Sequence, residues 1–529
     1  MPGVIAAGHP QTAAAGAEIL QQGGNAVDAA VAAAFASFIT EAVLVNIGGG
    51  GIAQVYIPTT KQALVYDFFS AMPGLAPNGA QPPPTEIDFR QILVDFGPVQ
   101  QPFYIGRGSV AVPGVVAGLC QLVAEQGTRP LPQILAPAIR LAREGVVLTE
   151  ALAYVAHILT PIFTDTPEIA AIYAPTGRIA AAGERLHFPA LACTLAELGQ
   201  AGASFFYTGE IGRQILADQR AHGGLLTAAD LSSYQVHKTE PIAIDYRGYT
   251  VLLPPPSSSG GVLIAFALKL LASVELRGWV HNSFEHTRLL IEVMRLANIA
   301  RAEWDSPLKQ AEGIDKLLAA ANVTRYRRKL EQALAGQAVE PEPNLRHGPG
   351  STTHISVADA SGMIVGITTS AGESAGFALG QTGVTLNNML GEIDLHPNGF
   401  HRLPAGERLM TMMSPALVLR QGEPRLAVGS GGSNRLRSAI MQVISNFIDF
   451  NFPLNRAVDA PRLHFEDNVV QLEGGIDAAV ADQLAAAGYA VNRWPARNMF
   501  FGGAHAVAQD NGQWVAAGDR RRGGSVWVV

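Results

Sequence analysis

The stretch HGPGSTTHISVADASGMIVGITTSAG, residues 347–372, contains two segments in which apolar and polar residues alternate, THISVAD and MIVGITTS, on either side of DASG. This pattern is typical of a β-hairpin with a tight turn. Folding the hairpin about Ser361 places Thr352, at the start of the first strand, opposite Thr369 or Ser370 at the end of the second. The sequence therefore predicts a cluster of hydroxyl groups at one end of the hairpin, although threonine pairs also occur in sheets for structural reasons alone.

Thr352 gains a particular chemistry if the peptide bond between Ser351 and Thr352 is cut. A free α-amino group has a pKa of about 7.7–8.0, so it can act as a general base at physiological pH. It can then accept the proton of its own side-chain hydroxyl and create a nucleophile without a histidine relay. The same hydroxyl can attack the Ser351 carbonyl before the cut, so the hairpin is compatible with self-cleavage.

The chain before the hairpin is predicted to be mainly helical. GHPQTAAAGAEILQQGGNAVDAA, residues 8–30, indicates two helices separated by a stop at Gly23 and Gly24. In NIGGGGIAQVYI, residues 46–57, four glycines precede a strand. The glycines either cradle a phosphate or allow the backbone to approach an active site closely. Their spacing and the strand that follows them disfavour a nucleotide-binding loop.

Farther along, residues 130–145 predict a helix that ends at Gly145. LPPPSSSGG, residues 253–261, is either a linker or the N-terminus of the apolar helix that follows. Residues 283–336 are predicted to be helical, and residues 337–350 to form an exposed, flexible segment. Short strands are predicted after the hairpin, in PALVLR, LAVGS, VVQLE, HAVAQ and SVWVV. A helix-rich first part and a strand-rich tail favour an α/β architecture in which helices cover sheets.

The composition limits the classes of function. The chain has 529 residues, of which 48% are hydrophobic and 15% charged, so it can bury a large core in two domains or one layered domain. A net charge of −7 disfavours nucleic-acid binding, and the basic run Arg520–Arg522 is interpreted as a solvated turn. Cys120 and Cys193 are expected to be buried thiols rather than a disulfide or metal pair. With neither a membrane span nor a leader sequence evident, we expect a cytoplasmic protein, or a periplasmic or secreted one if the N-terminus is trimmed.

A second candidate site is VGSGGSNRLRSAI, residues 428–440, where Gly431 and Gly432 separate a strand from a helix. Consecutive backbone N–H groups in such a turn can bind an oxyanion. A tight turn that requires glycine explains the same pattern equally well.

Together these segments resemble the γ-glutamyltranspeptidases, a family of the N-terminal nucleophile hydrolases. The similarity extends almost from end to end, through GHPQTAAAGAEILQQGGNAVDAAVAAAF, NIGGGG, SVAVPGVVAG, PAIRLAREG, PPPSSSGG, TTHISVAD, MMSPALVL, GSGGSNR and DAPRLHFE. The resemblance implies a four-layer αββα sandwich that cuts itself into residues 1–351 and 352–529, which together form one domain. It also implies transfer or hydrolysis of the γ-glutamyl group of glutathione and related small-molecule amides, with no metal or cofactor.

The resemblance assigns roles to the two candidate sites. Thr352 corresponds to the nucleophile and its own base, and Ser370 to the hydroxyl that braces the new amine. Gly432, together with Gly431 or Ser433, corresponds to the oxyanion donors. The family has GSPGG where this chain has GSGGS, so the second donor is either Gly431 or Ser433.

The resemblance also suggests a binding site for the substrate. Arg90, in EIDFRQ, corresponds to the arginine that binds the substrate α-carboxylate, a contact that suits the two-pronged guanidinium group. Glu392 stands where the family usually has the aspartate that binds the substrate amine. Thr411 occupies the first position of a pair that is usually serine.

Several departures from the family pattern affect substrate specificity. Gly372 replaces an asparagine, Met389 a glutamine, and Met412 the second serine of the pair. Because specificity depends on polar contacts to the substrate, their loss should weaken discrimination in favour of a γ-glutamyl group. Two alternatives therefore remain beside a γ-glutamyltranspeptidase: an acylase of the same fold for a less polar acyl group, and an uncut scaffold without turnover. The acyl acceptor is expected to be either water or an amino acid or peptide.

Overall fold

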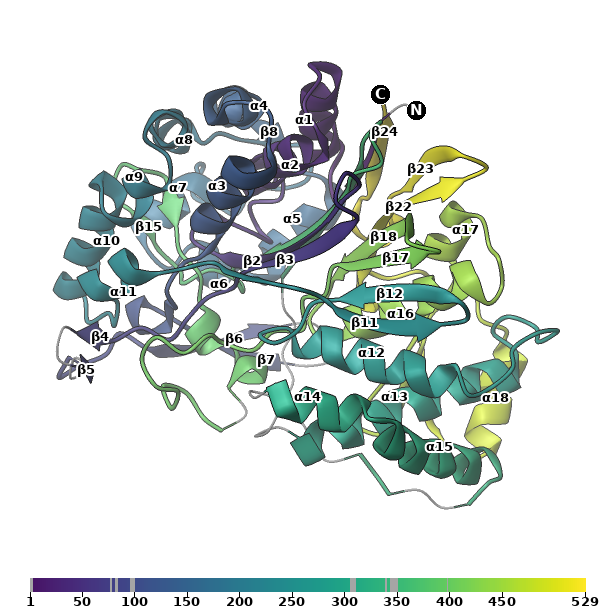
Figure 1. The fold of residues 1–529 in the computed structure, drawn as a ribbon. Coiled ribbons are helices and arrows are strands. Elements are labelled where there is room, and N and C mark those ends of the chain that lie inside the picture. Colours follow the sequence, from purple (N-terminus) through teal and green to yellow (C-terminus); the bar gives the residue numbers. More distant parts are fainter. Residues whose placement is uncertain are drawn as a thin grey trace.

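Two central β-sheets face each other, and helices cover the outer side of each sheet (Figure 1). The computed structural model describes residues 3–76, 79–80, 84–95, 100–304, 311–337, 340–342, 351–396 and 398–529. The order of the layers is helix, sheet, sheet, helix. The predicted four-layer αββα sandwich is therefore confirmed.

The first sheet has seven strands and the second has six. In spatial order the first sheet contains β10 (His237–Thr239), β3 (Gln62–Phe68), β2 (Gly50–Ile57), β14 (Ile364–Ser370), β13 (Thr353–Ala358), β1 (Val4–Ala7) and β24 (Ser525–Val528). The second contains β11 (Ile242–Tyr246), β12 (Tyr249–Leu253), β17 (Ala416–Arg420), β18 (Glu423–Gly431), β22 (Gly503–Asp510) and β23 (Gln513–Ala517). Both sheets combine strands from before and after residue 351, so the chain on the two sides of the expected cut is interleaved.

The helices form two outer layers. On the first sheet and around it lie α1 (Pro10–Gln21), α2 (Ala26–Thr40), α3 (Val115–Gln126), α4 (Leu131–Glu144), α5 (Glu150–Ile158), α6 (Thr160–Phe163), α7 (Pro167–Tyr173), α8 (Pro189–Ala201), α9 (Ala203–Tyr207), α10 (Glu210–Ala221) and α11 (Ala228–Ser233). On the side of the second sheet lie α12 (Ser259–Leu271), α13 (Phe284–Trp304), α14 (Ala311–Leu318), α15 (Ala320–Leu334), α16 (Arg435–Ile448), α17 (Leu454–Asp459) and α18 (Ala478–Ala486). A small sheet of β19 (Leu463–Glu466), β20 (Val469–Leu472) and β21 (Ala490–Arg493) also lies on this side.

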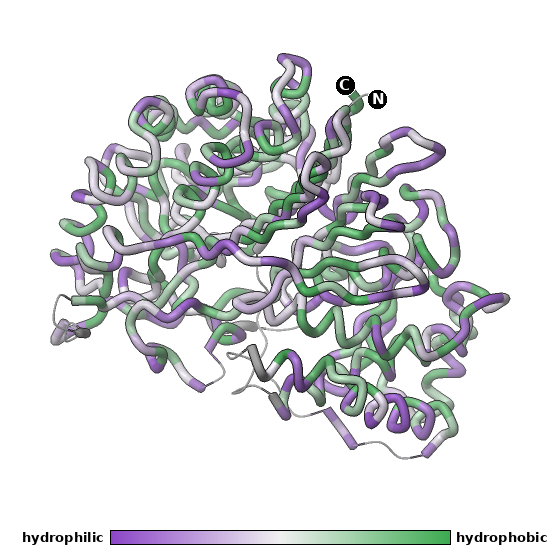
Figure 2. The backbone as a smooth tube through the Cα atoms, viewed as in Figure 1, coloured by the Kyte–Doolittle hydropathy of each residue, from purple (hydrophilic) through white to green (hydrophobic). Residues whose placement is uncertain are grey.

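Apolar side chains fill the spaces between the layers. Figure 2 shows hydrophobic residues concentrated along the central strands, with many hydrophilic residues on the outer turns. Every residue of α2 is buried, because this helix lies between the first sheet and the neighbouring helices α1 and α4. This position explains why its sequence is apolar all around. Between the two sheets, a smaller cluster includes Tyr56, Leu417 and Trp514.

The central hairpin has the predicted position and register. β13 pairs with β14 so that Thr353 lies opposite Thr369, and continuing by one residue places Thr352 opposite Ser370. The glycines before β2 allow close backbone approach. A Cβ atom at Gly49 would lie only 2.3 Å from the carbonyl oxygen of Ser370. Of the two interpretations of this glycine run, the structure favours close packing beside the hairpin.

The helix that follows the prolines begins where the serines predict. Ser258 is its N-cap, and its hydroxyl accepts a hydrogen bond from the Gly261 N–H at 2.9 Å. Because Ser258 is fully buried, this segment is not a domain linker. The predicted helical region 283–336 contains α13, α14 and α15. Most of the segment predicted to be flexible, residues 338–339 and 343–350, lies outside the described residues.

Two smaller predictions are wrong. Cys193 is exposed rather than buried, whereas Cys120 is partly buried and packs against the core; both are free thiols, as predicted. The basic run Arg520–Arg522 is not a solvated turn, because the side chain of Arg521 is completely buried, whereas that of Arg520 is 76% exposed. Among the described residues, no helix is both long and apolar enough to cross a membrane.

Candidate active site

Thr352 lies where the two central sheets meet. It directly precedes β13 in the first sheet, and only 5% of its surface is exposed. Gly431, the last residue of β18 in the second sheet, packs against it: a Cβ atom at Gly431 would lie 2.1 Å from the carbonyl oxygen of Thr352. A side chain at this position would push the two strands apart, so the contact requires glycine.

The peptide bond before Thr352 is held by the hydroxyl of Ser370. Ser370 Oγ donates a hydrogen bond to the carbonyl oxygen of Ser351 at 2.5 Å and accepts one from the Gly372 N–H at 3.2 Å. A donor on a carbonyl oxygen stabilises the negative charge that develops there during nucleophilic attack. The geometry is therefore suited to polarising the bond that the sequence predicts to be cut.

A cavity of about 40 Å³ opens beside Thr352. Its polar lining residues are Thr352, Ser370, Glu392, Asp394, Thr411 and Ser433, and Gly372 also lines it. Its apolar lining residues are Phe69, Met389, Leu395, Met412, Met413 and Leu436. The structure thus brings together five of the residues predicted from the sequence: Thr352, Ser370, Ser433, Glu392 and Thr411.

Three carboxyl groups lie close together here: Glu392 and Asp394 line the cavity, and Glu373 is a neighbour of Glu392. Burial raises the pKa of Glu392 well above its usual value, and the neighbouring Glu373 raises it further. Burial also raises the pKa of Glu373, whose carboxyl group binds the backbone of Ser351. Asp394, whose pKa burial raises as well, accepts a hydrogen bond from Ser433 Oγ at 3.0 Å. In the described part of the chain, no group of three histidine, cysteine or acidic residues could hold a metal ion.

Arg90 does not line this cavity. Its Nη1 and Nη2 atoms donate to the two carboxylate oxygens of Asp165 at 2.9 and 2.8 Å, and its Nε donates to Asp88 at 2.9 Å. The guanidinium group is thus bound on both sides by carboxylates of the protein itself, although its side chain is 47% exposed. The sequence does not reveal this pairing, because Asp165 lies 75 residues away.

The glycine turn connects β18 to α16. Gly432 has a φ of +123° and Ser433 a φ of +50°, so the chain turns sharply before α16 begins at Arg435. Gly431 contacts Thr352, and Ser433 lines the cavity. That Gly432, together with Gly431 or Ser433, supplies the backbone N–H groups that bind an oxyanion stays a prediction.

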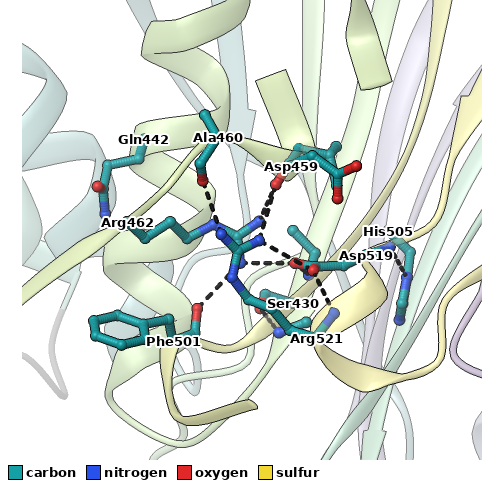
Figure 3. Close-up of polar contacts among 12 residues, drawn as sticks. Ser430, Gln442, Asp459, Ala460, Arg462, Phe501, His505, Asp519 and Arg521 are labelled. Atoms are coloured by element: carbon teal, nitrogen blue, oxygen red, sulfur yellow. Dashed lines mark hydrogen bonds and ion pairs between the residues drawn. The ribbon is translucent and has the colours of Figure 1, made fainter. Parts of the chain in front are cut away.

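A buried ionic network lies behind this turn (Figure 3). Asp519 binds Arg462 at 2.7 Å and Arg521 at 3.1 Å, and Arg521 also binds Glu473 at 2.5 Å. Burial alone would raise the pKa of Asp519, but the two arginines lower it to about 2. The network fixes the C-terminal segment, which includes the 3-10 helix η6 (Arg520–Arg522), against the end of β22.

Sequence reasoning missed several residues of the site. Glu373 and Asp394 each follow a predicted site residue within three positions, Glu373 after Ser370 and Asp394 after Glu392. Each is a carboxylate among small or apolar residues, and this pattern could have indicated a role in the site. Phe69 and Leu436 gave no comparable signal, because apolar residues at the ends of strands and helices are common in any core.

Comparison with known proteins agrees with this geometry. The family model described as gamma-glutamyltranspeptidase matches residues 12–529. The chain belongs to this family. As a family member it is 34% identical over 522 residues to an acylase ACY 1 proenzyme of Pseudomonas sp. strain V22, covering 96% of this chain and 89% of that protein. It is 29% identical over 555 residues to a glutathione hydrolase proenzyme of Bacillus subtilis strain 168, covering 99% and 91%.

The solved structures that match the chain also include both acylases and γ-glutamyl enzymes. The crystal structure of a cephalosporin acylase from Bacillus halodurans matches with a TM-score of 0.85 and 27% identity, covering 99% of this chain and 95% of that one. The Helicobacter pylori γ-glutamyltranspeptidase structure matches with a TM-score of 0.53 and 26% identity, covering 63% of this chain and 91% of that one. The similarity therefore includes both acylases and γ-glutamyl enzymes.

Proposed function

We propose that this protein is a self-processing acylase with an N-terminal threonine nucleophile, whose acyl group is less polar than γ-glutamyl. The proposed cut separates residues 1–351 from 352–529. The names of the relatives support processing, since both the acylase and the glutathione hydrolase are described as proenzymes. The hydrogen bond from Ser370 to the Ser351 carbonyl supports the position of the cut.

The proposed cut is an N-to-O acyl shift. Thr352 Oγ attacks the carbonyl carbon of Ser351, whose oxygen is held by Ser370. The hydroxyl proton passes to the Thr352 nitrogen as the bond from that carbon to the nitrogen breaks, which leaves an ester on Oγ and a free amine on Thr352. Water hydrolyses the ester, which releases the carboxylate of Ser351 and restores the hydroxyl.

Turnover would use the same atoms with an external amide. The Thr352 amine accepts the hydroxyl proton while Oγ attacks the carbonyl carbon of the substrate. The proton passes to the leaving amine as the amide bond breaks, and an acyl ester remains on Thr352. Attack by water releases the acid, whereas attack by an acceptor amine yields a new amide.

The observation that favours a less polar acyl group is the wall of the cavity. Five of its apolar side chains, Phe69, Met389, Leu395, Met412 and Met413, lie within the same cavity as Thr352. Arg90, the expected partner for an α-carboxylate, is outside it and bound to two aspartates. A substrate α-carboxylate would have to compete with Asp165 for a bidentate contact.

A γ-glutamyl enzyme is the second candidate. It is supported by Glu392, whose carboxyl group lines the cavity and could bind the substrate amine, and by the similarity to glutathione hydrolases. The two candidates share the cut and the nucleophile. They differ only in the acyl group that the cavity accepts.

Intact mass spectrometry of the purified protein tests the cut. We expect two polypeptides, the smaller beginning Thr-Thr-His, and a single uncut chain for Thr352→Ala, because the hydroxyl performs the attack. Thr353→Ala is the matched control and should still be cut. A wild-type chain that stays uncut after prolonged incubation would refute the proposal and favour a scaffold without turnover.

Two chromogenic anilides then separate the candidates. We expect an aliphatic acyl p-nitroanilide to be hydrolysed with a kcat/KM at least tenfold higher than that of γ-glutamyl-p-nitroanilide. Thr352→Ala should abolish both activities. The opposite preference would reject the less polar acyl group and establish the γ-glutamyl candidate.

A further inference from the structure

Arg522 directly follows Arg521, a member of the buried ionic network, and its backbone N–H donates to the carbonyl oxygen of Asp519 at 3.2 Å. Its side chain runs along Gly503, where a Cβ atom would lie 2.5 Å from Arg522 Cδ. The guanidinium group ends at the turn. Cβ atoms at Gly431 and Gly432 would lie 3.3 Å from its Nη1 and 3.4 Å from its Nη2.

The guanidinium group of Arg522 is incompletely satisfied. Among the described residues, its buried Nε and Nη1 atoms have no hydrogen-bond partner. Asp519 and Glu41 act on it electrostatically, but the carboxylate of Asp519 pairs with Arg462 and Arg521. Both oxygens of the buried Glu41 carboxyl group are also taken, Oε1 by Thr12 at 2.8 Å and Oε2 by Thr353 at 2.6 Å. Burying donors of a charged group without partners is costly. Hydrogen bonds and ion pairs within the protein therefore do not explain why this positive charge is buried here.

The same position has a clear electrostatic consequence. Gly431 contacts the carbonyl of Thr352, so the charge lies directly behind the residues that face the nucleophile. Burial and the neighbouring Arg435 lower the pKa of Arg522 to about 10, which leaves the group charged at neutral pH. A fixed charge in a buried site stabilises an opposite charge that develops nearby.

We propose that Arg522 is a positioning residue for acyl transfer, which holds the Gly431–Gly432 turn and supplies positive charge behind the oxyanion of the tetrahedral intermediate. This inference rests on the proposed function. It does not extend to the cut itself, where the carbonyl oxygen of Ser351 is already bound by Ser370. Loss of the charge should therefore slow turnover more than self-cleavage.

The test compares variants that separate charge from volume. Arg522→Met keeps the length of the side chain without its charge, and Arg522→Lys keeps the charge. Arg520→Met is the matched control, because this residue belongs to the same 3-10 helix but is 76% exposed. For each cut protein, kcat and KM are measured with the better of the two anilides, and self-cleavage is followed by intact mass.

Removing one direct oxyanion donor typically lowers kcat by about 10²–10³-fold, and a charge acting from behind the donors acts more weakly. We therefore expect Arg522→Met to lower kcat by about 10- to 100-fold, with KM and the rate of self-cleavage within threefold of wild type. Arg522→Lys should recover at least half of that loss on a logarithmic scale, and Arg520→Met should change kcat less than twofold.

Three other results would contradict the proposed role of Arg522. If Arg522→Met is cut and folded with wild-type kcat, or if Arg522→Lys is equally slow, the proposal is overturned. Arg522→Gln replaces the methionine variant if that one does not fold, and failure of both would assign Arg522 to stability alone. A wild type that hydrolyses neither anilide would instead refute the proposed function, and this inference with it.

Discussion

Asp519→Asn should destabilise the protein far more than the loss of a surface ion pair. Asp519 is fully buried and neutralises Arg462 and Arg521 (Figure 3). It also accepts hydrogen bonds from the backbone of Ala504 and Arg521. Asparagine keeps the shape but removes the charge, which leaves two buried guanidinium groups with Glu473 as their remaining carboxylate.

The size of the effect follows from two estimates. Lowering the pKa of Asp519 from 3.8 to about 2 corresponds to about 2 kcal/mol of net stabilisation of the charged form. Breaking a buried ion pair by removing one partner typically costs about 3–5 kcal/mol. We therefore expect the free energy of unfolding to fall by about 2–4 kcal/mol, a large part of the roughly 5–15 kcal/mol that is usual for a folded protein.

The pH dependence has a fixed sign. The folded-state pKa is depressed, so the stabilisation by Asp519 is complete above its unfolded-state value and is lost as the pH falls toward about 2. The difference between wild type and Asp519→Asn should therefore be constant from pH 8 to pH 5 and shrink only below pH 4.

Urea unfolding followed by tryptophan fluorescence measures this difference. Asp482→Asn is the matched control, because Asp482 also pairs with an arginine, at 2.6 Å, but its side chain is 71% exposed. Such a surface pair contributes about 0–1 kcal/mol. Equal effects of the two substitutions would show that the buried network contributes no more than a surface pair and would refute the reasoning.

Three further predictions concern the site and the thiols. Gly431→Ala should lower kcat at least 100-fold, since its Cβ atom would meet the Thr352 carbonyl at 2.1 Å, whereas Gly199→Ala, with no contact closer than 3.4 Å, should leave kcat unchanged. Asp165→Asn should release Arg90 and raise the ratio of γ-glutamyl to aliphatic anilide hydrolysis at least fivefold; an unchanged ratio would show that Arg90 does not reach the substrate. Ellman's reagent should titrate one thiol in the native protein, because Cys193 is exposed and burial raises the pKa of Cys120 to about 12; two fast-reacting thiols would contradict this.

Local patterns in the sequence predicted the parts of the fold that depend on local physics. The hairpin was predictable because its alternation and the DASG turn specify both strands and their register within one residue. The start of α12 was predictable because Ser258 has the hydroxyl that an N-cap needs. Thr352 and Ser370 follow from the same hairpin, so this pair of site residues was within reach of the sequence.

Long-range pairing was not predictable in this way. A run of three arginines is normally solvated, and the burial of Arg521 depends on Glu473, which is 48 residues away. The pairing of Arg90 with Asp165 likewise depends on how α6 and α7 place a loop beside β6 (Arg90–Asp95). Charges satisfied by distant partners leave no periodic signal, so the sequence alone suggests solvent or substrate as their partner.

The site combines residues at strand ends with residues on connecting segments. This difference explains why the position of the proposed nucleophile is easier to predict than the acyl group of the substrate. Thr352, Ser370 and Gly431 lie at the ends of adjacent strands in the two central sheets, where a small displacement would disturb the core. Met389 and Glu392 lie instead in or beside the short 3-10 helix η3 (Met389–Gly391), outside both sheets. Residues on connecting segments can change without cost to the sheets. The proposed nucleophile is therefore compatible with either kind of acyl group, and the acyl group must be inferred from the connecting segments around it.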